Sequence, residues 1–207
     1  MVSKFLNMDQ EKQDRIINAA TKEFAEKGFS NASTNEIVKQ AGISKGLLFH
    51  YFKNKKELYV FLYEYYLELM VKDLFGKIDL EEGDIFTKYR SIAWHKFELM
   101  KKHPEMFDFV RSGYEEKALE VKLELQNKNK DIIADSYAKL SSKIDVEKFK
   151  GGVEVHKAIQ IIFWTLEGFA NQKQEQTKDI PLDQLDVEEL LMEMDSYIDM
   201  LRLAFYK

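Results

Sequence analysis

The 207-residue sequence predicts a nearly all-α protein. Apolar residues recur at intervals of three and four along most of the chain, which is the period of an amphipathic helix. The strict alternation typical of strands is hard to find, and only Pro104 and Pro181 interrupt the chain. Hydrophobic residues make up 45% and charged residues 32% of the sequence, as in soluble globular proteins. We expect about nine helices.

The first helix is expected over residues 9–27. Ile16, Ala20 and Phe24 recur there at helical spacing and would form one buried face. Gly28 follows, and glycine readily adopts the left-handed conformation that ends a helix. The pattern therefore predicts a helix that ends at this glycine.

Two short helices follow. Ser33 and Glu36 have the spacing of a capping box, which predicts a helix over residues 34–41. Gly42 can end that helix and Ser44 can cap the next one. Two short helices joined by a glycine-containing turn of about four residues form the helix-turn-helix pattern.

The third helix is expected over residues 45–52, and its two faces differ. Leu48, Tyr51 and Phe52 fall on one side, where they can pack on the preceding helices. The opposite side and its flank lack acidic residues, which suits contact with base edges in the major groove of DNA. The expected base contacts are Lys45, Gly46, Leu47, Phe49 and His50.

Polar and cationic residues surround this helix in the sequence. Helix starts present free amides and a positive dipole, which favour an anion such as a DNA phosphate. Such contacts set the orientation of a protein on the duplex. The expected phosphate contacts are Ser33, Thr34, Ser44, Tyr51, Lys53, Asn54 and Lys55.

The charge distribution agrees with a polyanion at one end of the chain. Residues 1–57 carry ten Lys and Arg against seven Asp and Glu, whereas the remaining residues carry 21 against 29. A basic head on an acidic body is expected when only the head meets nucleic acid. The excess in the head is modest, so charge alone does not decide the function.

The rest of the chain predicts further helices. A long aromatic helix is expected over residues 55–75, and another over residues 85–102. Pro104 suits the first turn of a helix or helix pair reaching Ser142, with possible breaks at Gly113 and at residues 127–130.

Two C-terminal helices, around residues 155–170 and 187–205, have apolar stripes wider than one neighbour requires. Helices of this kind often form a dimer interface. The expected interface residues are Ile159, Ile162, Leu166, Phe169, Leu191, Met194, Ile198 and Leu201.

Aromatic residues in the body could line an apolar pocket for a small effector, or could equally be ordinary core. Glu167 or His95 could supply a polar group to such a pocket. The candidate pocket residues are Trp94, Phe97, Met100, Phe107, Phe163 and Trp164.

The sequence lacks the residues that several functional classes require. The chain has no cysteine, and its four histidines show no metal-binding spacing, so we expect no metal and no cofactor. No phosphate-binding loop, nucleophile elbow or Ser-His-Asp set is apparent, so we expect no enzyme. No apolar run approaches the ~20 residues of a membrane span, and no signal peptide is evident, which predicts a cytoplasmic protein.

The N-terminal motifs resemble those of TetR/AcrR-type transcriptional regulators. The similar stretches read AxxxFAEKGF from Ala20, STNEI from Ser33, AGISKG from Ala41 and LLFHYFKNKKEL from Leu47. The resemblance implies a DNA-binding domain over residues 1–54 and an α-helical effector-binding and dimerisation domain over residues 55–207.

By the same resemblance, the recognition helix falls on residues 45–51, and the family's phosphate-binding lysine falls on Lys55. Most members have a tyrosine where this chain has Phe49. A phenyl ring cannot donate to a phosphate, so Phe49 either meets a thymine methyl or packs inward.

Two functions remain open at this point. The first is a repressor that binds a palindromic operator as a homodimer and is released by a small, lipophilic effector, although activation is also possible. The second is a ligand- or partner-binding helical module, possibly enzymatic, whose head no longer binds DNA. Strong, salt-dependent retention on DNA would favour the first.

Overall fold

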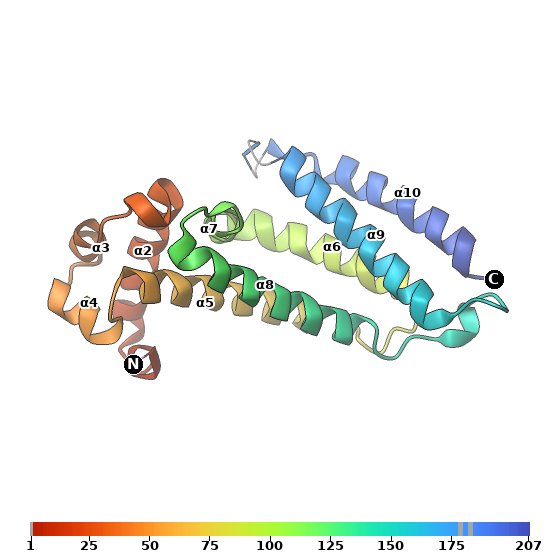
Figure 1. The fold of residues 1–207 in the computed structure, drawn as a ribbon, viewed down its shortest axis with the longest axis horizontal. Coiled ribbons are helices and arrows are strands. Elements are labelled where there is room, and N and C mark those ends of the chain that lie inside the picture. Colours follow the sequence, from red (N-terminus) through yellow and green to blue (C-terminus); the bar gives the residue numbers. More distant parts are fainter. Residues whose placement is uncertain (1, 178–179, 182–183) are drawn as a thin grey trace. The chain divides into compact units, whose positions relative to one another are not determined.

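The computed structural model describes residues 2–177, 180–181 and 184–207. These residues form ten α-helices and one 3₁₀ turn, and no strand is present in them apart from one isolated bridge (Figure 1). The elements are α1 (Val2–Leu6), α2 (Gln10–Asn31), α3 (Thr34–Ala41), α4 (Lys45–Tyr51), α5 (Lys55–Lys77), α6 (Ile85–Lys102), α7 (Pro104–Glu115), α8 (Leu119–Leu140), η1 (Val146–Lys148), α9 (Val155–Gln176) and α10 (Val187–Phe205). The all-α prediction is confirmed.

The chain divides into two compact units. The first unit comprises Met1–Val71 and His103–Asp131, and the second comprises Lys72–Lys102 and Ile132–Lys207. The first unit therefore combines the N-terminal helices with α7 and the start of α8. The predicted functional division after residue 54 stays a prediction.

Most helix boundaries follow the sequence signals. The helices predicted over residues 34–41 and 85–102 begin and end as expected, as α3 and α6. The possible break at residues 127–130 does not occur, because α8 continues through them and the interruption falls between α7 and α8. Neither α1 nor η1 was predicted from the sequence.

Gly28 bends α2 without ending it. Its φ of 66° and ψ of 173° are non-helical, yet one more helical turn follows, as far as Asn31. The Glu116 carboxylate stabilises this turn, because its Oε2 accepts a hydrogen bond of 2.9 Å from the Phe29 amide. The same side chain accepts from the Ala118 amide at 2.8 Å, which ties the α7–α8 turn to the end of α2.

Gly113 lies inside α7 and does not break it, contrary to one possibility considered from the sequence. A Cβ at this position would lie 2.3 Å from Cε2 of Tyr63 on α5. Glycine therefore allows α7 to approach the tyrosine ring. The Tyr63 hydroxyl in turn donates to Oδ1 of Asn129 at 2.8 Å, a buried contact with α8.

Aromatic rings form the core of the first unit. Tyr59 lies edge-on to Phe24 and to Phe109, with centroid distances of 4.8 and 5.5 Å. These three rings come from α5, α2 and α7, and all are fully buried. Edge-to-face pairs stabilise a core beyond the area that they bury, so this cluster fixes α5 against both neighbours.

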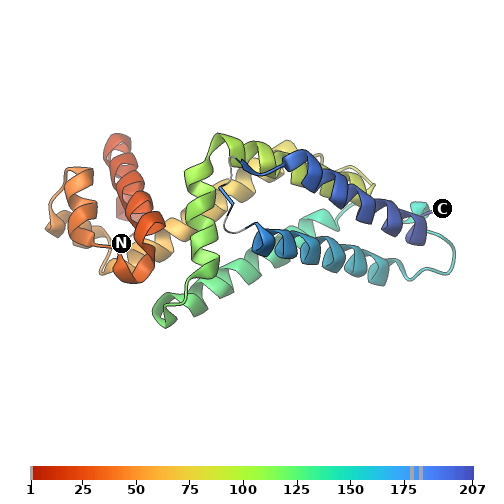
Figure 2. The same cartoon turned by 90° about the horizontal axis from the view of Figure 1, so that it is seen from above.

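In the second unit, α10 packs against α6 and α9, and Figure 2 shows α9 and α10 running alongside each other. The Tyr206 ring, just after α10, contacts Phe86 and Phe149 at centroid distances of 5.0 and 4.9 Å. A backbone bridge between Phe149 and Tyr206 holds the end of α10 against the segment after η1.

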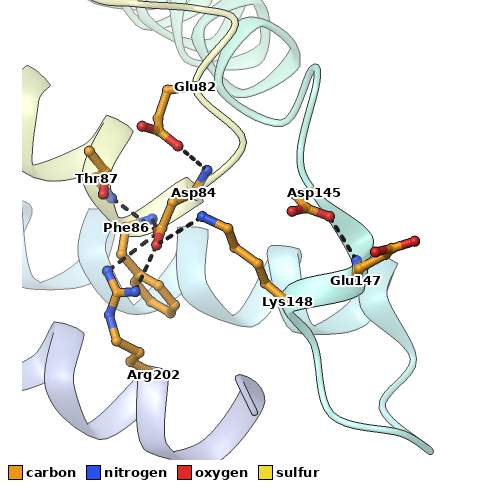
Figure 3. A network of polar contacts seen from close by, with 8 residues as sticks. All are labelled: Glu82, Asp84, Phe86, Thr87, Asp145, Glu147, Lys148 and Arg202. Atoms are coloured by element: carbon orange, nitrogen blue, oxygen red, sulfur yellow. Dashed lines mark hydrogen bonds and ion pairs between the residues drawn. The ribbon is translucent and has the colours of Figure 1, made fainter.

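Asp84 is the centre of a polar network in this unit (Figure 3). Its carboxylate accepts from Arg202 at 2.7 Å and from the Phe86 amide at 2.9 Å, and Lys148 lies 3.6 Å away. Burial acts to raise the pKa of Asp84, but the hydrogen bonds from Arg202 and the α6 amides outweigh it and hold the pKa below its usual value. The network joins the start of α6 to η1 and α10.

Candidate nucleic-acid interface

The turn between α3 and α4 has the local structure that its sequence requires. Gly42 is left-handed, with φ 65° and ψ 40°, and caps the end of α3. The Ile43 amide then donates to the Val38 carbonyl at 3.0 Å. Ser44 caps α4, because its Oγ accepts from the Leu47 amide at 3.2 Å. These contacts set the angle between the two helices of the motif.

The inward face of α4 is the one predicted. Leu48 and Phe52 are buried, and Phe52 lies 5.0 Å from the Phe5 ring and 5.2 Å from the Phe61 ring. Tyr51 is half-buried, with its ring 5.8 Å from Phe5. Phe5 belongs to α1, which packs on α4. A five-residue helix carries too little periodicity to be found from sequence.

The outward face of α4 is accessible. Lys45, Gly46 and His50 are exposed, and a Cβ added to Gly46 would meet no atom within 4 Å. Leu47 and Phe49 are half-buried, and the Lys45 ammonium lies 5.9 Å from the Phe49 ring centroid. No acidic residue occurs between positions 37 and 56. All five predicted base-contact residues thus keep some exposure, and their contact with DNA stays a prediction.

The capping box predicted at the start of α3 does not form. The Ser33 amide donates instead to Oε1 of the buried Glu23 at 2.8 Å, so it does not need Glu36. Glu36 pairs with Lys39 at 3.8 Å, and the Ser33 hydroxyl makes no capping hydrogen bond. The hydroxyls of Ser33 and Thr34 are therefore placed at a helix start that no side chain caps.

The start of α5 is capped by side chains. Oδ1 of Asn54 accepts from the Glu57 amide at 2.8 Å, and the Glu57 carboxylate accepts from the Lys53 amide at 3.0 Å. The Lys53 backbone hydrogen bond lowers the pKa of Glu57. The Lys53 ammonium is exposed and lies 3.3 Å from the same carboxylate, an ion pair that water screens. Asn54 is thus the cap of α5, and Lys53 can reach outward.

Lys55 has a structural partner that the sequence did not reveal. Its ammonium donates to the carbonyls of Ser30 and Ala32 at 3.0 and 3.2 Å, and it lies 4.8 Å from the Phe29 ring centroid. Carbonyls at a helix end attract a cation. In this structure Lys55 holds the end of α2, so two of its three donors are already used.

The predicted effector residues belong to both units and differ in exposure. Trp94 and Trp164 are 45% and 64% exposed, whereas Met100 is buried in the second unit. Phe97 and Phe163 are half-buried there, and Phe107 is buried in the first unit. Their role in a pocket stays a prediction.

The predicted dimer residues mostly face the interior of their own unit. Six of them are buried, and Phe169 and Leu201 are half-buried. The buried six are Ile159, Ile162, Leu166, Leu191, Met194 and Ile198. Large apolar side chains on other faces of α9 and α10 are exposed instead. They include Ile161, Trp164, Met192, Met200 and Leu203.

Neither a metal cluster nor a membrane span is found in the described part of the chain. No group of three or more His, Asp or Glu side chains there is placed to hold a metal ion. None of the helices of residues 2–177 and 184–207 is both long and apolar enough to cross a bilayer.

Comparison with known proteins gives one consistent result. The family model of bacterial regulatory proteins of the tetR family matches residues 16–60, which include α3 and α4. The fatty acid metabolism regulator protein of Bacillus subtilis (strain 168) is 30% identical over 166 residues, which are 74% of this chain and 78% of that protein.

Solved structures show the same fold. A tetR family transcription regulator from Shewanella sp. PV-4 has a TM-score of 0.67 at 16% identity, covering 96% of this chain and 100% of that one. The regulator FadR from Bacillus subtilis, in complex with stearoyl-CoA, has a TM-score of 0.61 at 21% identity, covering 87% and 96%.

Proposed function

This chain belongs to the TetR family of bacterial regulatory proteins, and we propose that it represses transcription by binding a pseudo-palindromic operator as a homodimer. A small lipophilic effector then releases the repressor from DNA. The protein would act in the cytoplasm, without a catalytic step.

The outward face of α4 is the observation that carries the DNA-binding part of this proposal. Lys45 and His50 are exposed there, Gly46 allows close approach, and acids are absent from positions 37–56. Its inward residues Leu48 and Phe52 are locked in the core, so the face is presented rigidly. Lysine, histidine and apolar contacts of this kind can read base edges in the major groove.

The exposed apolar residues of α9 and α10 support the homodimer. Trp164, Met200 and Leu203 are each more than 60% exposed, and burying such side chains against a second copy removes apolar surface from water. One head reads only half a site, so a two-fold dimer gives a palindromic operator.

The relatives support an acyl compound as the effector. The 30% identical relative is a fatty acid metabolism regulator, and the FadR structure contains stearoyl-CoA. We propose that this chain responds to a molecule with a long acyl chain. Binding would favour a head spacing that no longer fits successive grooves, with α5 and α7 transmitting the change.

Selection from random duplexes tests this function. The dimeric protein at low salt should enrich a pseudo-palindrome, and its affinity should fall steeply as salt rises, because each head displaces counterions from phosphates. Long-chain acyl-CoA should then release the enriched duplex. Failure to enrich any palindrome would reject the operator, and enrichment without release would reject the effector class.

A further inference from the structure

A groove lies beside the α7–α8 turn, within the first unit. Its volume is about 390 Å³, and residues of both helices line it. Gly113 and Tyr114 of α7 and Glu116 of the turn form one wall, and residues of α8 form the other. The side chains of the α8 wall decide which ligand the groove suits.

The α8 wall carries two rows of side chains. Lys122, Gln126 and Lys130 follow one another at intervals of four, so they form a row along the helix with neighbouring Cβ atoms about 6 Å apart. These three residues are exposed. Leu125 and Asn129 form a second row and are buried. The groove therefore has an accessible rim with two cations and an amide above a buried floor.

The two lysines of the rim differ from Lys128, which lies on the same helix. Lys128 forms an ion pair with Glu64 of α5. In the part of the chain that the structure describes, Lys122 and Lys130 form neither an ion pair nor a side-chain hydrogen bond. Both ammonium groups are therefore available to a ligand.

Asn129 brings a third donor to the floor of the groove. Its Oδ1 accepts from the Tyr63 hydroxyl at 2.8 Å, which fixes the orientation of the amide. Its Nδ2 forms no hydrogen bond with the described residues, yet the buried side-chain atoms that lack a partner among them are the hydroxyls of Tyr59 and Tyr206. Asn129 is 8% exposed and lines the groove, so its Nδ2 meets solvent there. A donor that is already held in place loses little freedom when it binds a ligand.

Acceptors in the groove are fewer than donors. Among the described residues that line it, Glu116 supplies the one carboxylate, which already accepts from the amides of Phe29 and Ala118 at 2.9 and 2.8 Å. The unused donors include two cations, and such a set favours an anion. Tyr114 is 47% exposed and adds an aromatic side chain to the opposite wall.

We propose that this groove binds an organic diphosphate. Two linked phosphate groups place anionic oxygens along the row from Lys122 to Lys130, and Asn129 donates to one of them. A single phosphate meets only part of this row. The organic group lies against Tyr114. A free nucleotide and the nucleotide end of an acyl-CoA both carry this diphosphate. The inference goes beyond the proposed function, because binding in the groove does not require release of DNA.

Calorimetric titration of the full chain with ADP, AMP and CoA at low salt tests the proposal. ADP and CoA should bind, and AMP should bind at least about fivefold more weakly, because it lacks the second phosphate. Lys122→Met and Lys130→Met should each weaken ADP binding by about tenfold, the value of a charged hydrogen bond. Both lysines are exposed, so these variants should fold like the wild type.

Three further variants locate the binding site. Asn129→Asp keeps an acceptor for the Tyr63 hydroxyl but replaces the amide donor by an anion, so it should weaken ADP binding by about tenfold or more. Its unfolding midpoint shows whether the fold is retained. Lys117→Met is the matched control, since Lys117 is exposed near the groove but does not line it. Lys53→Met tests for binding of ADP to the N-terminal head. Both lysine controls should bind ADP like the wild type.

The outcomes are distinct. No binding of ADP or CoA, unchanged binding by Lys122→Met and Lys130→Met, or an equal loss in Lys117→Met or Lys53→Met overturns the proposal. Equal affinities for AMP and ADP overturn the assignment to a diphosphate. Tighter binding of CoA than of ADP supports the acyl-CoA source, and the reverse supports a free nucleotide. If the groove binds CoA but dodecanoyl-CoA does not release operator DNA, the site stands and the proposed effector class fails.

Discussion

At the scale of single residues, Gly113 is the position at which the backbone of α7 lies against the Tyr63 ring of α5. Gly113→Ala places a Cβ 2.3 Å from Cε2 of Tyr63, a ring that the core and the Asn129 hydrogen bond hold in place. We expect a loss of stability of about 1–3 kcal/mol from overpacking. Urea unfolding followed by circular dichroism measures it.

Gly76→Ala is the control for this substitution. Gly76 is also helical, but a Cβ there meets no atom within 4 Å, so alanine should leave stability unchanged or raise it by roughly 0.5–1 kcal/mol. Equal unfolding midpoints for the two variants would show that α7 can move away from Tyr63 at little cost.

Lys55 shows what residue types alone cannot reveal. A lysine at a helix start within a DNA-binding motif indicates a phosphate contact, and the same residue here donates to two carbonyls of α2. Glu23 likewise binds the Ser33 amide ten residues away. Both contacts depend on how α2 packs against later residues, which no local pattern encodes.

At the scale of elements, we expect α4 to recognise bases and the residues at the start of α5 to bind phosphates. His50→Ala removes an exposed group of the outward face, so it should change the preferred base at particular operator positions. Lys53→Ala removes an exposed cation beside α4, so it should weaken binding to all DNA sequences alike. The number of counterions released on binding should fall by about one.

Selection and salt titration of both variants check this division. A change in base preference caused by Lys53→Ala, or a uniform weakening caused by His50→Ala, would contradict the assigned roles. Lys55→Ala is unsuitable for the comparison, because it would also free the carbonyls of Ser30 and Ala32 and destabilise the head.

Helix boundaries were predictable where the signal is local. Gly42, Ser44 and Asn54 end or cap their helices through hydrogen bonds to residues at most five positions away, and the predicted limits there were correct within one or two residues. Gly113 and the α7–α8 interruption were not predictable, because the approach of Tyr63 and the Glu116 contacts come from distant segments.

The candidate interface was easier to predict than the body. On α4, Leu48 is buried and Lys45, Gly46 and His50 are exposed, as one helical projection predicts. The other three residues of this helix are half-buried. On α9 and α10 almost every face carries apolar residues, so periodicity could not separate the buried Ile162 and Ile198 from the exposed Ile161 and Met200.

At the scale of the whole molecule, the proposed recognition of a palindromic operator requires a homodimer. Trp164→Glu puts a charge on an exposed apolar face of α9, and burying an unpaired charge in an interface is costly. The wild type should have twice the 24.4 kDa mass of the chain by light scattering, and the variant should shift toward monomer and lose operator binding.

Trp94→Glu provides the comparison, because Trp94 is also an exposed tryptophan but lies on α6. It should remain dimeric. Dissociation of both variants, or of neither, would contradict the assignment of the dimer interface to α9.

The make-up of the first unit also bears on how such regulators can be recombined. Residues His103–Asp131 fold with the N-terminal helices, and Glu116 and Gly113 lie in that later segment. A chimera that joins this head to another sensing domain by one crossover after residue 54 would leave Phe29 without Glu116 and Phe24 without Tyr59, so both would face foreign partners. Successful grafts, in the laboratory or in evolution, would have to transfer two separated stretches of gene together, or adapt α7 to its new neighbours.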